Sequence, residues 1–365
     1  MNEDIKYMKR ALQLAKKGKG YTHPNPAVGA VIVKDGKIIG EGYHKKAGMP
    51  HAEREAIKDA KEKGYDIKGS TMYVTLEPCC HYGRTPPCTN AIIEEGIKKV
   101  VVATLDPNPL VAGQGIEILK KAGIETKIGI LQEEAKKLNE DFFVYITEKR
   151  PFIHLKIAQT IDGKIATKIG SSKWITSEKS RKFAHKLRLE ASAVMVGVNT
   201  ALKDNPSLTI RYIKSKKQPK RILIDRYIKT PIDFNIFNQE AQTILFCSKN
   251  ADKSKIEKLR EKNIKIYQLE EKEERLDLKE ILKILAEEEQ VIHLLVEGGK
   301  DLITQFIKNQ LYDKISVFIA PKIVGEDGIS SIGKLDILDI KDAKLLNINL
   351  IKKIDTDIYL ELGRF

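Results

Sequence analysis

The chain has few cysteines for its length and no long hydrophobic run. Four cysteines among 365 residues are too few for the disulfide framework of a secreted domain. The N-terminus MNEDIKYMKR is charged from its second residue onward and lacks the apolar core of a secretory signal. The longest apolar runs, 27–33 and 292–296, are much too short to span a bilayer. We therefore expect a cytosolic protein that does not associate with a membrane.

The chain also lacks a concentrated block of charge, although its net charge is +14. No six consecutive residues carry the same charge, and no basic stretch is interleaved with aromatic residues of the kind that stack on nucleic acid. A lysine-rich solvated surface explains most of this charge, and the positive excess would suit phosphorylated small molecules. We expect a small-molecule substrate and no nucleic-acid partner.

Three of the four cysteines, Cys79, Cys80 and Cys88, fall within ten positions of one another. In a reducing compartment such crowding indicates metal binding or catalysis. Cys247 follows the apolar run Ile244-Leu245-Phe246 and is predicted to be a buried small hydrophobic residue.

The length exceeds what one hydrophobic core usually serves, so two domains are expected. In the first half, helices and strands alternate, and the turn signal Asp35-Gly36 predicts a β-hairpin. This alternation predicts an α/β fold arranged as a three-layer sandwich. The predicted elements are a helix at 4–17, strands at 27–34 and 37–43, a helix at 51–63, a strand at 71–76, a helix at 88–95, a strand at 100–104, a helix at 115–121, a strand at 125–130 and one helix from 132 to about 147.

The segment Glu148-Lys149-Arg150-Pro151 is the predicted linker, because Pro151 disfavours helical geometry at Arg150. We therefore divide the chain into a first domain at 1–147, a linker at 148–151 and a second domain at 152–365. In the second domain the predicted strands lie at 152–158, 193–198, 221–225, 243–246, 291–296 and 314–319, and the predicted helices at 177–189, 253–261, 278–288 and 301–309.

The most informative residues are His51-Ala52-Glu53, Pro78-Cys79 and Cys88. A catalytic zinc site takes three protein ligands, with imidazole and thiolate preferred, and leaves the fourth position for water. Hydrolytic deamination needs such an activated water and a carboxylate that moves protons. His51, Cys79 and Cys88 are therefore the predicted metal ligands, and Glu53 the predicted catalytic proton carrier.

The spacing of the two cysteines departs from the H-x-E and P-C-x-x-C pattern of zinc deaminases. Cys88 lies nine positions after Cys79, and the intervening segment contains Gly83, Pro86 and Pro87. These residues suit an extended loop that returns to the start of a helix, where the positive end of the helix would present Cys88 to the metal.

A closed structural zinc site is the alternative, with Cys80 or His81 as a fourth ligand. That alternative leaves Glu53 without a role. A solvated surface histidine at position 51 is a weaker alternative, given Glu53 and the nearby cysteines.

In the second half of the chain the sequence motifs are less specific for one function. Glu297-Gly298-Gly299 follows a predicted strand and precedes a predicted helix, where glycines permit close backbone approach and the helix N-terminus can bind phosphate. A plain strand-to-helix turn explains the two glycines equally well. The G-x-G-x-x-G fingerprint of the Rossmann fold is absent.

Several longer motifs extend along almost the whole chain. They are Thr22-His23-Pro24-Asn25-Pro26-Ala27-Val28-Gly29, Gly42-Tyr43-His44, Pro50-His51-Ala52-Glu53, Thr75-Leu76-Glu77-Pro78-Cys79, Gly83-Arg84-Thr85-Pro86-Pro87-Cys88, the segment 155–163, Ser172-Lys173-Trp174-Ile175-Thr176, Gly197-Val198-Asn199-Thr200, the segment 204–211 and Glu297-Gly298-Gly299. Together they closely resemble the bifunctional deaminase–reductase family of riboflavin biosynthesis. The long loop between Cys79 and Cys88 is itself a mark of that family, whose members commonly carry serine at the position of Cys80.

The resemblance implies a cytidine-deaminase-like three-layer α/β/α sandwich followed by a dihydrofolate-reductase-like α/β domain. The first domain would hold one Zn²⁺ and deaminate 2,5-diamino-6-(5-phosphoribosylamino)pyrimidin-4-one. The second would use NADPH to reduce the ribosyl side chain to ribityl. A homo-oligomer is also expected.

The resemblance also implies binding residues. In the first domain Asn25, His44 and the loop around Arg84 would hold the pyrimidine and its ribose phosphate, although Asn25 between two prolines also suits a plain turn. The implied NADPH contacts are Ala158, Trp174, Thr200, Asp204, Gly299, Lys300, Asp301, Leu302, Ile303, Thr304 and Gln305. The implied substrate contacts of the second domain are Ser172, Arg188, Leu208, Arg211 and Glu297.

Simpler roles exist for some of these residues. Trp174 could pack in the core and Arg188 could lie on a solvated helix face, whereas the family pattern assigns arginine forks to the substrate phosphate. Lys156 and Asp162 are candidate proton donors by residue type alone.

Two other functions would fit parts of the sequence. A nucleic-acid base deaminase predicts a basic, aromatic channel, which the sequence lacks. A non-catalytic binding protein predicts loss of Glu53 or of the glycine turn, and both are present.

Overall fold

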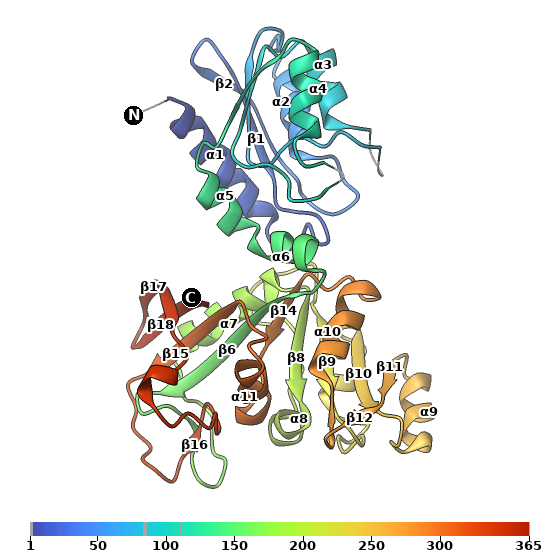
Figure 1. Ribbon diagram of the computed structural model, residues 1–365, viewed down its shortest axis with the longest axis vertical. Coiled ribbons are helices and arrows are strands. Elements are labelled where there is room, and N and C mark those ends of the chain that lie inside the picture. The colour runs from blue at the N-terminus through green and yellow to red at the C-terminus, as the bar shows by residue number, and fades with distance from the viewer. Residues whose placement is uncertain (1–2, 83–85, 110, 365) are drawn as a thin grey trace. The chain divides into compact units, whose positions relative to one another are not determined.

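The computed structural model describes residues 3–82, 86–109 and 111–364. The chain forms two compact units, residues 1–150 and residues 151–365 (Figure 1). The division falls within the segment 148–151. Among the described residues, no helix is both long and apolar enough to cross a membrane.

The N-terminal unit is built on a five-stranded sheet with the order β2-β1-β3-β4-β5. Strand β1 pairs antiparallel with β2 and β3, whereas β3, β4 and β5 are parallel. Its elements are α1 (Glu3–Gly18), β1 (Gly29–Lys34), β2 (Lys37–Tyr43), α2 (Ala52–Glu62), β3 (Thr71–Val74), α3 (Cys88–Glu94), β4 (Lys99–Val102), α4 (Gln114–Lys121), β5 (Glu125–Ile128), α5 (Gln132–Leu138) and α6 (Glu140–Glu148).

Helices cover both faces of this sheet, which confirms the three-layer sandwich. Alternate residues of β1 point to opposite sides, so Ile32 packs with α2, α3 and α4 while Val31 packs with α1 and α5. The hairpin turn predicted at Asp35-Gly36 is also present, since both residues adopt the positive φ that a tight two-residue turn requires.

Helix α2 lies unusually close to β2. A Cβ atom at Gly42 would stand 2.4 Å from both the carbonyl oxygen of Ala52 and the backbone nitrogen of Ala56. Only glycine therefore permits this approach. The contact fixes the first turn of α2, which carries Glu53 and directly follows His51.

The prediction of one helix from 132 to about 147 was wrong. The chain forms two helices, α5 and α6, and the break lies at Asn139, whose φ of −114° and ψ of 25° leave the helical region. The Asn139 side chain bonds to the backbone of Ala27, 112 residues away. This tertiary contact explains a break that helical periodicity does not show.

The C-terminal unit is built on a nine-stranded sheet with the order β11-β10-β9-β8-β14-β6-β15-β18-β17. The strands from β11 to β15 run parallel, and β18 and β17 continue the sheet antiparallel. These strands are β6 (Phe152–Thr160), β8 (Ala193–Gly197), β9 (Lys220–Ile224), β10 (Thr243–Ser248), β11 (Lys265–Leu269), β14 (His293–Val296), β15 (Lys314–Ala320), β17 (Leu346–Ile354) and β18 (Asp357–Arg364).

Helices again cover both faces of the parallel part of the sheet, as parallel sheets require. α10 and α11 pack on one face, and α7 and α9 on the other. The helices are α7 (Glu178–Glu190), α8 (Val198–Asp204), α9 (Lys253–Glu261), α10 (Leu278–Glu287) and α11 (Lys300–Lys308); the smaller elements are the strands β7 (Lys164–Ala166), β12 (Glu271–Lys272), β13 (Arg275–Leu276) and β16 (Ile329–Ser330) and the 3₁₀ turns Asn235–Phe237 and Ile340–Asp342.

Candidate active sites

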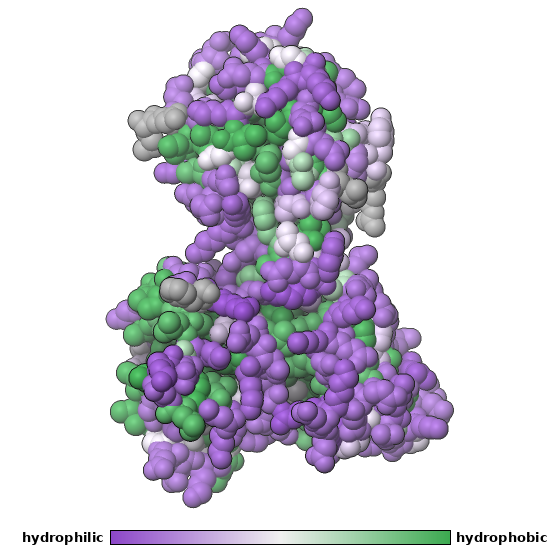
Figure 2. Space-filling model, in the orientation of Figure 1, coloured by the Kyte–Doolittle hydropathy of each residue, from purple (hydrophilic) through white to green (hydrophobic). Residues whose placement is uncertain are grey.

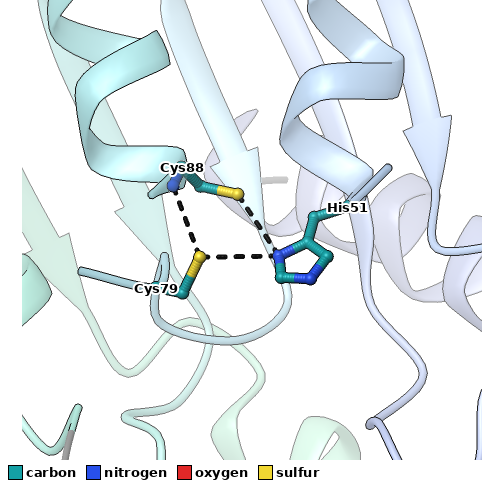
Figure 3. Close-up of side chains that lie close together, drawn as sticks. All are labelled: His51, Cys79 and Cys88. Atoms are coloured by element: carbon teal, nitrogen blue, oxygen red, sulfur yellow. Dashed lines mark hydrogen bonds between the residues drawn. The ribbon is translucent and has the colours of Figure 1, made fainter. Parts of the chain in front are cut away.

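Three predicted metal ligands converge in the N-terminal unit (Figure 3). His51 precedes α2, Cys79 lies in the loop after β3, and Cys88 is the first residue of α3. The Nδ1 atom of His51 lies 3.5 Å from the Sγ atom of Cys79 and 3.4 Å from that of Cys88. All three donor atoms lie within 4.8 Å of one another.

The surroundings of Cys79 favour a thiolate. The thiol of Cys88 donates a hydrogen bond to the Sγ atom of Cys79, and the backbone N–H of Cys88 donates a second one over 3.3 Å. His51 also lies beside this sulfur. These contacts, Cys88 first, outweigh burial and lower the pKa of Cys79 to about 4. A deprotonated sulfur is the form that binds metal.

Glu53 follows two residues after His51 and is only 3% exposed. Burial raises the pKa of its carboxyl group above the ordinary value. Among the described residues, the cluster of donor atoms contains His51, Cys79 and Cys88 and does not include Glu53. The carboxyl group thus lies at the cluster without belonging to the ligand set.

Within the part of the chain that the structure describes, neither Cys80 nor His81 belongs to this cluster of donor atoms, which there offers three ligands. Burial raises the pKa of the Cys80 thiol, so that side chain stays protonated near neutral pH. Arg84 lies outside the described residues.

Asn25 and His44 lie next to the cluster. The amide nitrogen of Asn25 is 3.1 Å from Nε2 of His44, and Nδ1 of His44 is 3.1 Å from the carbonyl oxygen of Pro50. The ring of His44 meets that of His51 edge to face, with centroids 5.2 Å apart. Burial lowers the pKa of His44, so its imidazole is neutral near pH 7.

Glu77 belongs to the motif at 75–79, and no role was expected for it from the sequence. Its buried carboxylate accepts backbone N–H groups from Asp106, Gly113 and Ile116 at 3.3, 2.9 and 3.2 Å. Gly115 permits this contact, since a Cβ there would lie 2.3 Å from the Pro78 carbonyl oxygen. Glu77 therefore holds the loop that carries Cys79 against the start of α4.

Two adjoining cavities of about 700 and 520 Å³ occupy the C-terminal unit. Both include Gly299 and Thr200, near the carboxyl ends of β14 and β8. Ligands bind at this edge of parallel sheets in many α/β folds. β6 continues beyond the paired end of β14, so Lys156 and Ala158 flank the larger cavity.

Most of the binding residues expected in this unit line these cavities. Thr200, Asp204, Gly299 and Ser172 line both. Ala158, Trp174, Arg188, Leu208, Arg211, Glu297 and Ile303 line the larger cavity, and Lys300, Asp301, Leu302 and Gln305 the smaller.

Thr304 is the exception. Its hydroxyl group donates to the Lys300 carbonyl oxygen at 2.6 Å and accepts from the Gly333 N–H at 2.7 Å. It lines neither cavity, and these two bonds account for its position.

Arg188 and Glu297 form a two-pronged ion pair inside the larger cavity. Nε and Nη2 of Arg188 donate to the two carboxylate oxygens at 2.6 and 3.0 Å, and Nη1 donates to the Thr209 carbonyl oxygen. Arg188 is therefore not on a solvated helix face. Burial alone would raise the pKa of Glu297, but the charge and hydrogen bonds of Arg188 outweigh it and lower that pKa to about 2.

The alternative of core packing for Trp174 is wrong, because the side chain is 59% exposed. It lines the larger cavity, and the guanidinium group of Arg181 lies 4.4 Å from its ring centroid.

The two candidate proton donors differ in position. Lys156 lines the larger cavity, and burial lowers the pKa of its ammonium group. Asp162 lines neither cavity and accepts from the N–H groups of Val324 and Gly325 at 3.1 and 2.7 Å. Its pKa is lowered to about 2, chiefly by a hydrogen bond from Thr160. The ionised carboxylate of Asp162 thus holds the loop at Val324 and Gly325 in place.

The smaller cavity is also lined by Arg226 and Arg275, for which no role was expected from the sequence. Arg226 follows β9, stacks on Tyr227 at 4.4 Å and lies 3.2 Å from Glu271. Arginines soon after a strand are common on protein surfaces, so the position of Arg226 in the sequence gives no sign that it lines a cavity.

The fold and these sites define a deaminase joined to a reductase. Residues 151–360 match the RibD C-terminal domain, and residues 1–104 match the cytidine and deoxycytidylate deaminase zinc-binding region. The chain belongs to the RibD family and is a riboflavin-biosynthesis enzyme with a deaminase domain and a reductase domain.

Relatives resemble the chain over its full length. Riboflavin biosynthesis protein RibD of Aquifex aeolicus is 54% identical over 363 residues, which cover 99% of each chain. RibD of Escherichia coli is 38% identical over 374 residues, again 99% of each chain. The crystal structure of a diaminohydroxyphosphoribosylaminopyrimidine deaminase/5-amino-6-(5-phosphoribosylamino)uracil reductase from Thermotoga maritima is 41% identical, with a TM-score of 0.89, and the match covers 100% of this chain and 99% of that one.

The Arg188–Glu297 pair predicts a pH-dependent stability. Because the folded-state pKa of Glu297 lies below its ordinary value of 4.5, the pair stabilises the fold above pH 4.5, and this contribution is lost as the pH falls toward 2. Glu297→Gln should cost about 3 kcal/mol at pH 7, since it leaves a buried cation unpaired. The loss should shrink below pH 4.5.

Calorimetry of the unfolding of the C-terminal unit between pH 7 and pH 3 would measure this loss of stability in Glu297→Gln. The exposed Glu287→Gln is the matched control and should change stability little at either pH. A Glu297→Gln deficit that is independent of pH would contradict the assignment.

Proposed function

We propose that the chain performs two successive steps on one phosphoribosylated pyrimidine. The first is hydrolytic deamination of 2,5-diamino-6-(5-phosphoribosylamino)pyrimidin-4-one, and the second is NADPH-dependent reduction of the ribosyl side chain to ribityl. The observation that carries the proposal is the cluster of His51, Cys79 and Cys88 beside the buried Glu53. The name of the Thermotoga maritima relative supports the choice of substrates.

One zinc ion per chain is proposed for the N-terminal unit. One imidazole and two sulfurs within 4.8 Å form a donor set that suits zinc, and three ligands leave one position for water. Zinc in such a site makes water acidic enough to supply hydroxide near neutral pH.

Glu53 is the proposed proton carrier of the deaminase step. Its raised pKa suits a carboxyl group that accepts a proton from water and returns it to the ring nitrogen and the departing ammonia. Asn25 and His44 are proposed to hold the pyrimidine, because the two side chains contact each other and the His44 ring lies against that of His51.

For the reductase step, NADPH, which supplies a hydride, is proposed to bind in the smaller cavity and to extend into the adjoining part of the larger one, where Ala158 and Trp174 lie. The proposed contacts are Ala158, Trp174, Thr200, Asp204 and the segment 299–305. Thr304 would contribute indirectly, because its hydroxyl group bonds to the backbone of Lys300 and Gly333 and so holds them in place. Arg226 and Arg275 would hold the additional phosphate that distinguishes NADPH from NADH, as arginine does in other dinucleotide folds.

The larger cavity is proposed to bind the deaminated substrate through Ser172, Leu208, Arg211 and Glu297. We assign the phosphate to Arg211, because the guanidinium fork of Arg188 is already occupied by Glu297. Arg188 would hold Glu297 in place. Lys156 is the proposed proton donor to the sugar oxygen, since its lowered pKa eases release of a proton.

We further propose a cytosolic homo-oligomer formed through the C-terminal unit. Leu338, Ile340, Leu345, Ile348 and Ile351, here the C-terminal apolar strip, are 62–100% exposed. The last two lie on β17, an edge strand of the large sheet, and Figure 2 shows hydrophobic surface over this part. Exposed apolar patches and free strand edges favour association, and a second copy would cover both.

Glu53→Gln is predicted to reduce deamination by a factor of about 10²–10⁴, while zinc content and NADPH oxidation on pre-deaminated substrate persist. Cys88→Ser should instead lose zinc from the purified protein, because a ligand is removed. Ammonia release, product mass and elemental analysis would measure both variants. Near wild-type deamination by Glu53→Gln would refute the proton carrier, and full zinc occupancy in Cys88→Ser would refute the ligand set.

Arg226→Ala is predicted to raise the KM for NADPH about tenfold and to leave the KM for NADH nearly unchanged, because only NADPH carries the additional phosphate. Initial rates of the reductase step with each dinucleotide would test this. An equal rise in KM for NADPH and NADH would show that Arg226 does not bind the additional phosphate of NADPH.

Ile348→Lys is predicted to dissociate the oligomer, since a charge would be buried in an apolar contact. Light scattering coupled to size exclusion would give the mass. Ile118→Lys in the N-terminal unit, also an exposed isoleucine, is the control. A wild-type protein that is monomeric at micromolar concentration would contradict the proposed homo-oligomer.

A further inference from the structure

The loop 22–28, which carries Asn25, lacks two backbone donors, and at its end the carbonyl oxygen of Val28 accepts from the N–H of His44 at 2.9 Å. Pro24 and Pro26 have no N–H to donate, and the N–H of Asn25 bonds locally to the carbonyl oxygen of Thr22 at 2.8 Å. The loop therefore depends on contacts from other parts of the chain to hold its shape before β1 begins.

Asn139 supplies such a contact with both ends of its amide group. Its Oδ1 accepts the N–H of Ala27 at 2.8 Å, and its Nδ2 donates to the carbonyl oxygen of Ala27 at 2.9 Å. The side chain is 2% exposed. Asparagine at the start of a helix usually caps that helix, but Asn139 makes no side-chain cap bond to α6.

The start of α6 contacts the same loop a second time. The Oδ2 atom of the buried Asp141 lies 3.2 Å from Nε2 of His23, and its Oδ1 lies 3.5 Å from Nζ of Lys19. Two side chains from one helix start thus hold both flanks of the Pro24-Asn25-Pro26 segment.

The loop in turn positions the groups beside the metal ligands. Asn25 contacts His44 at 3.1 Å, and His44 contacts the carbonyl oxygen of Pro50, the residue before His51. A continuous series of contacts therefore runs from Asn139 through the loop to the pyrimidine pocket.

We propose that Asn139 is a positioning residue of the deaminase, which sets the affinity of the site for its pyrimidine by fixing the loop 22–28. The inference rests on the proposed role of Asn25 and His44. The backbone segments that carry the zinc ligands, directly before α2, at the start of α3 and after β3, lie outside the loop 22–28 that this clamp holds. Loss of the clamp should therefore raise KM and spare both zinc binding and the chemical step.

Asn139→Asp and Asn139→Ala test the proposal in the full-length protein. The aspartate retains an acceptor for the Ala27 N–H but sets a carboxylate oxygen against the Ala27 carbonyl, and the alanine removes both bonds. We expect the KM for deamination of the diaminopyrimidine nucleotide to rise about tenfold in each. The kcat should stay within threefold, with zinc content and reductase KM unchanged.

Tyr73→Phe is the matched control, because it removes one part-buried hydrogen bond, to Asp4, on the α1 side of the same sheet. It should leave the deaminase KM unchanged. Hydrogen exchange followed by mass spectrometry adds a readout independent of activity, and the peptide containing Ala27 should exchange faster in Asn139→Asp than in Tyr73→Phe.

An unchanged KM in Asn139→Asp, or a loss of zinc and kcat in place of the KM effect, would overturn the inference. Asn25→Ala and His44→Ala separate it from the proposed function. If these two variants raise KM and Asn139→Asp does not, the positioning role alone fails. If none of them raises KM, the proposed pyrimidine pocket is wrong as well.

Discussion

The close packing of α2 on β2 is the constraint on which the deaminase site depends. The absence of a side chain at Gly42 lets the first turn of α2 lie against the strand; that turn carries Glu53, and His51 directly precedes it. The two sulfurs reach His51 from another direction, through a loop that Glu77 braces and a helix that begins at Cys88. Because the three ligands come from separate elements, the donor set exists only when the sheet and both helices are in place.

Two buried carboxylates show how the same residue type is prepared for different tasks. Glu53 has a raised pKa because burial dominates its surroundings, which suits a group that carries protons. Glu297 has a lowered pKa because Arg188 outweighs burial, which keeps a fixed negative charge in the reductase cavity. The pKa of Glu297 is lowered chiefly by Arg188, with Lys156 and His185 adding to it, whereas burial outweighs the lowering effect of His51 on Glu53.

Much of the structure follows from local patterns. The Asp35-Gly36 turn, the helix at α2 and the buried strands of both sheets were predicted from periodicity and turn residues, because those signals act over a few residues. The strands β17 and β18 were not predicted, and neither was the break between α5 and α6. The break arises from the bonds between Asn139 and Ala27, which are formed across 112 residues.

The sequence by itself determined the chemistry: the spacing of His51, Glu53, Cys79 and Cys88 indicates a deaminase, because few other sites need that combination of donors and acid. The family resemblance added the reductase. Only the tertiary structure decided which side chains support the site, as the contacts of Glu77 with the start of α4 and the ion pair of Arg188 with Glu297 show. The physical reason is that ligand identity depends on residue type, whereas support, burial and charge pairing depend on partners that folding brings together from distant parts of the chain.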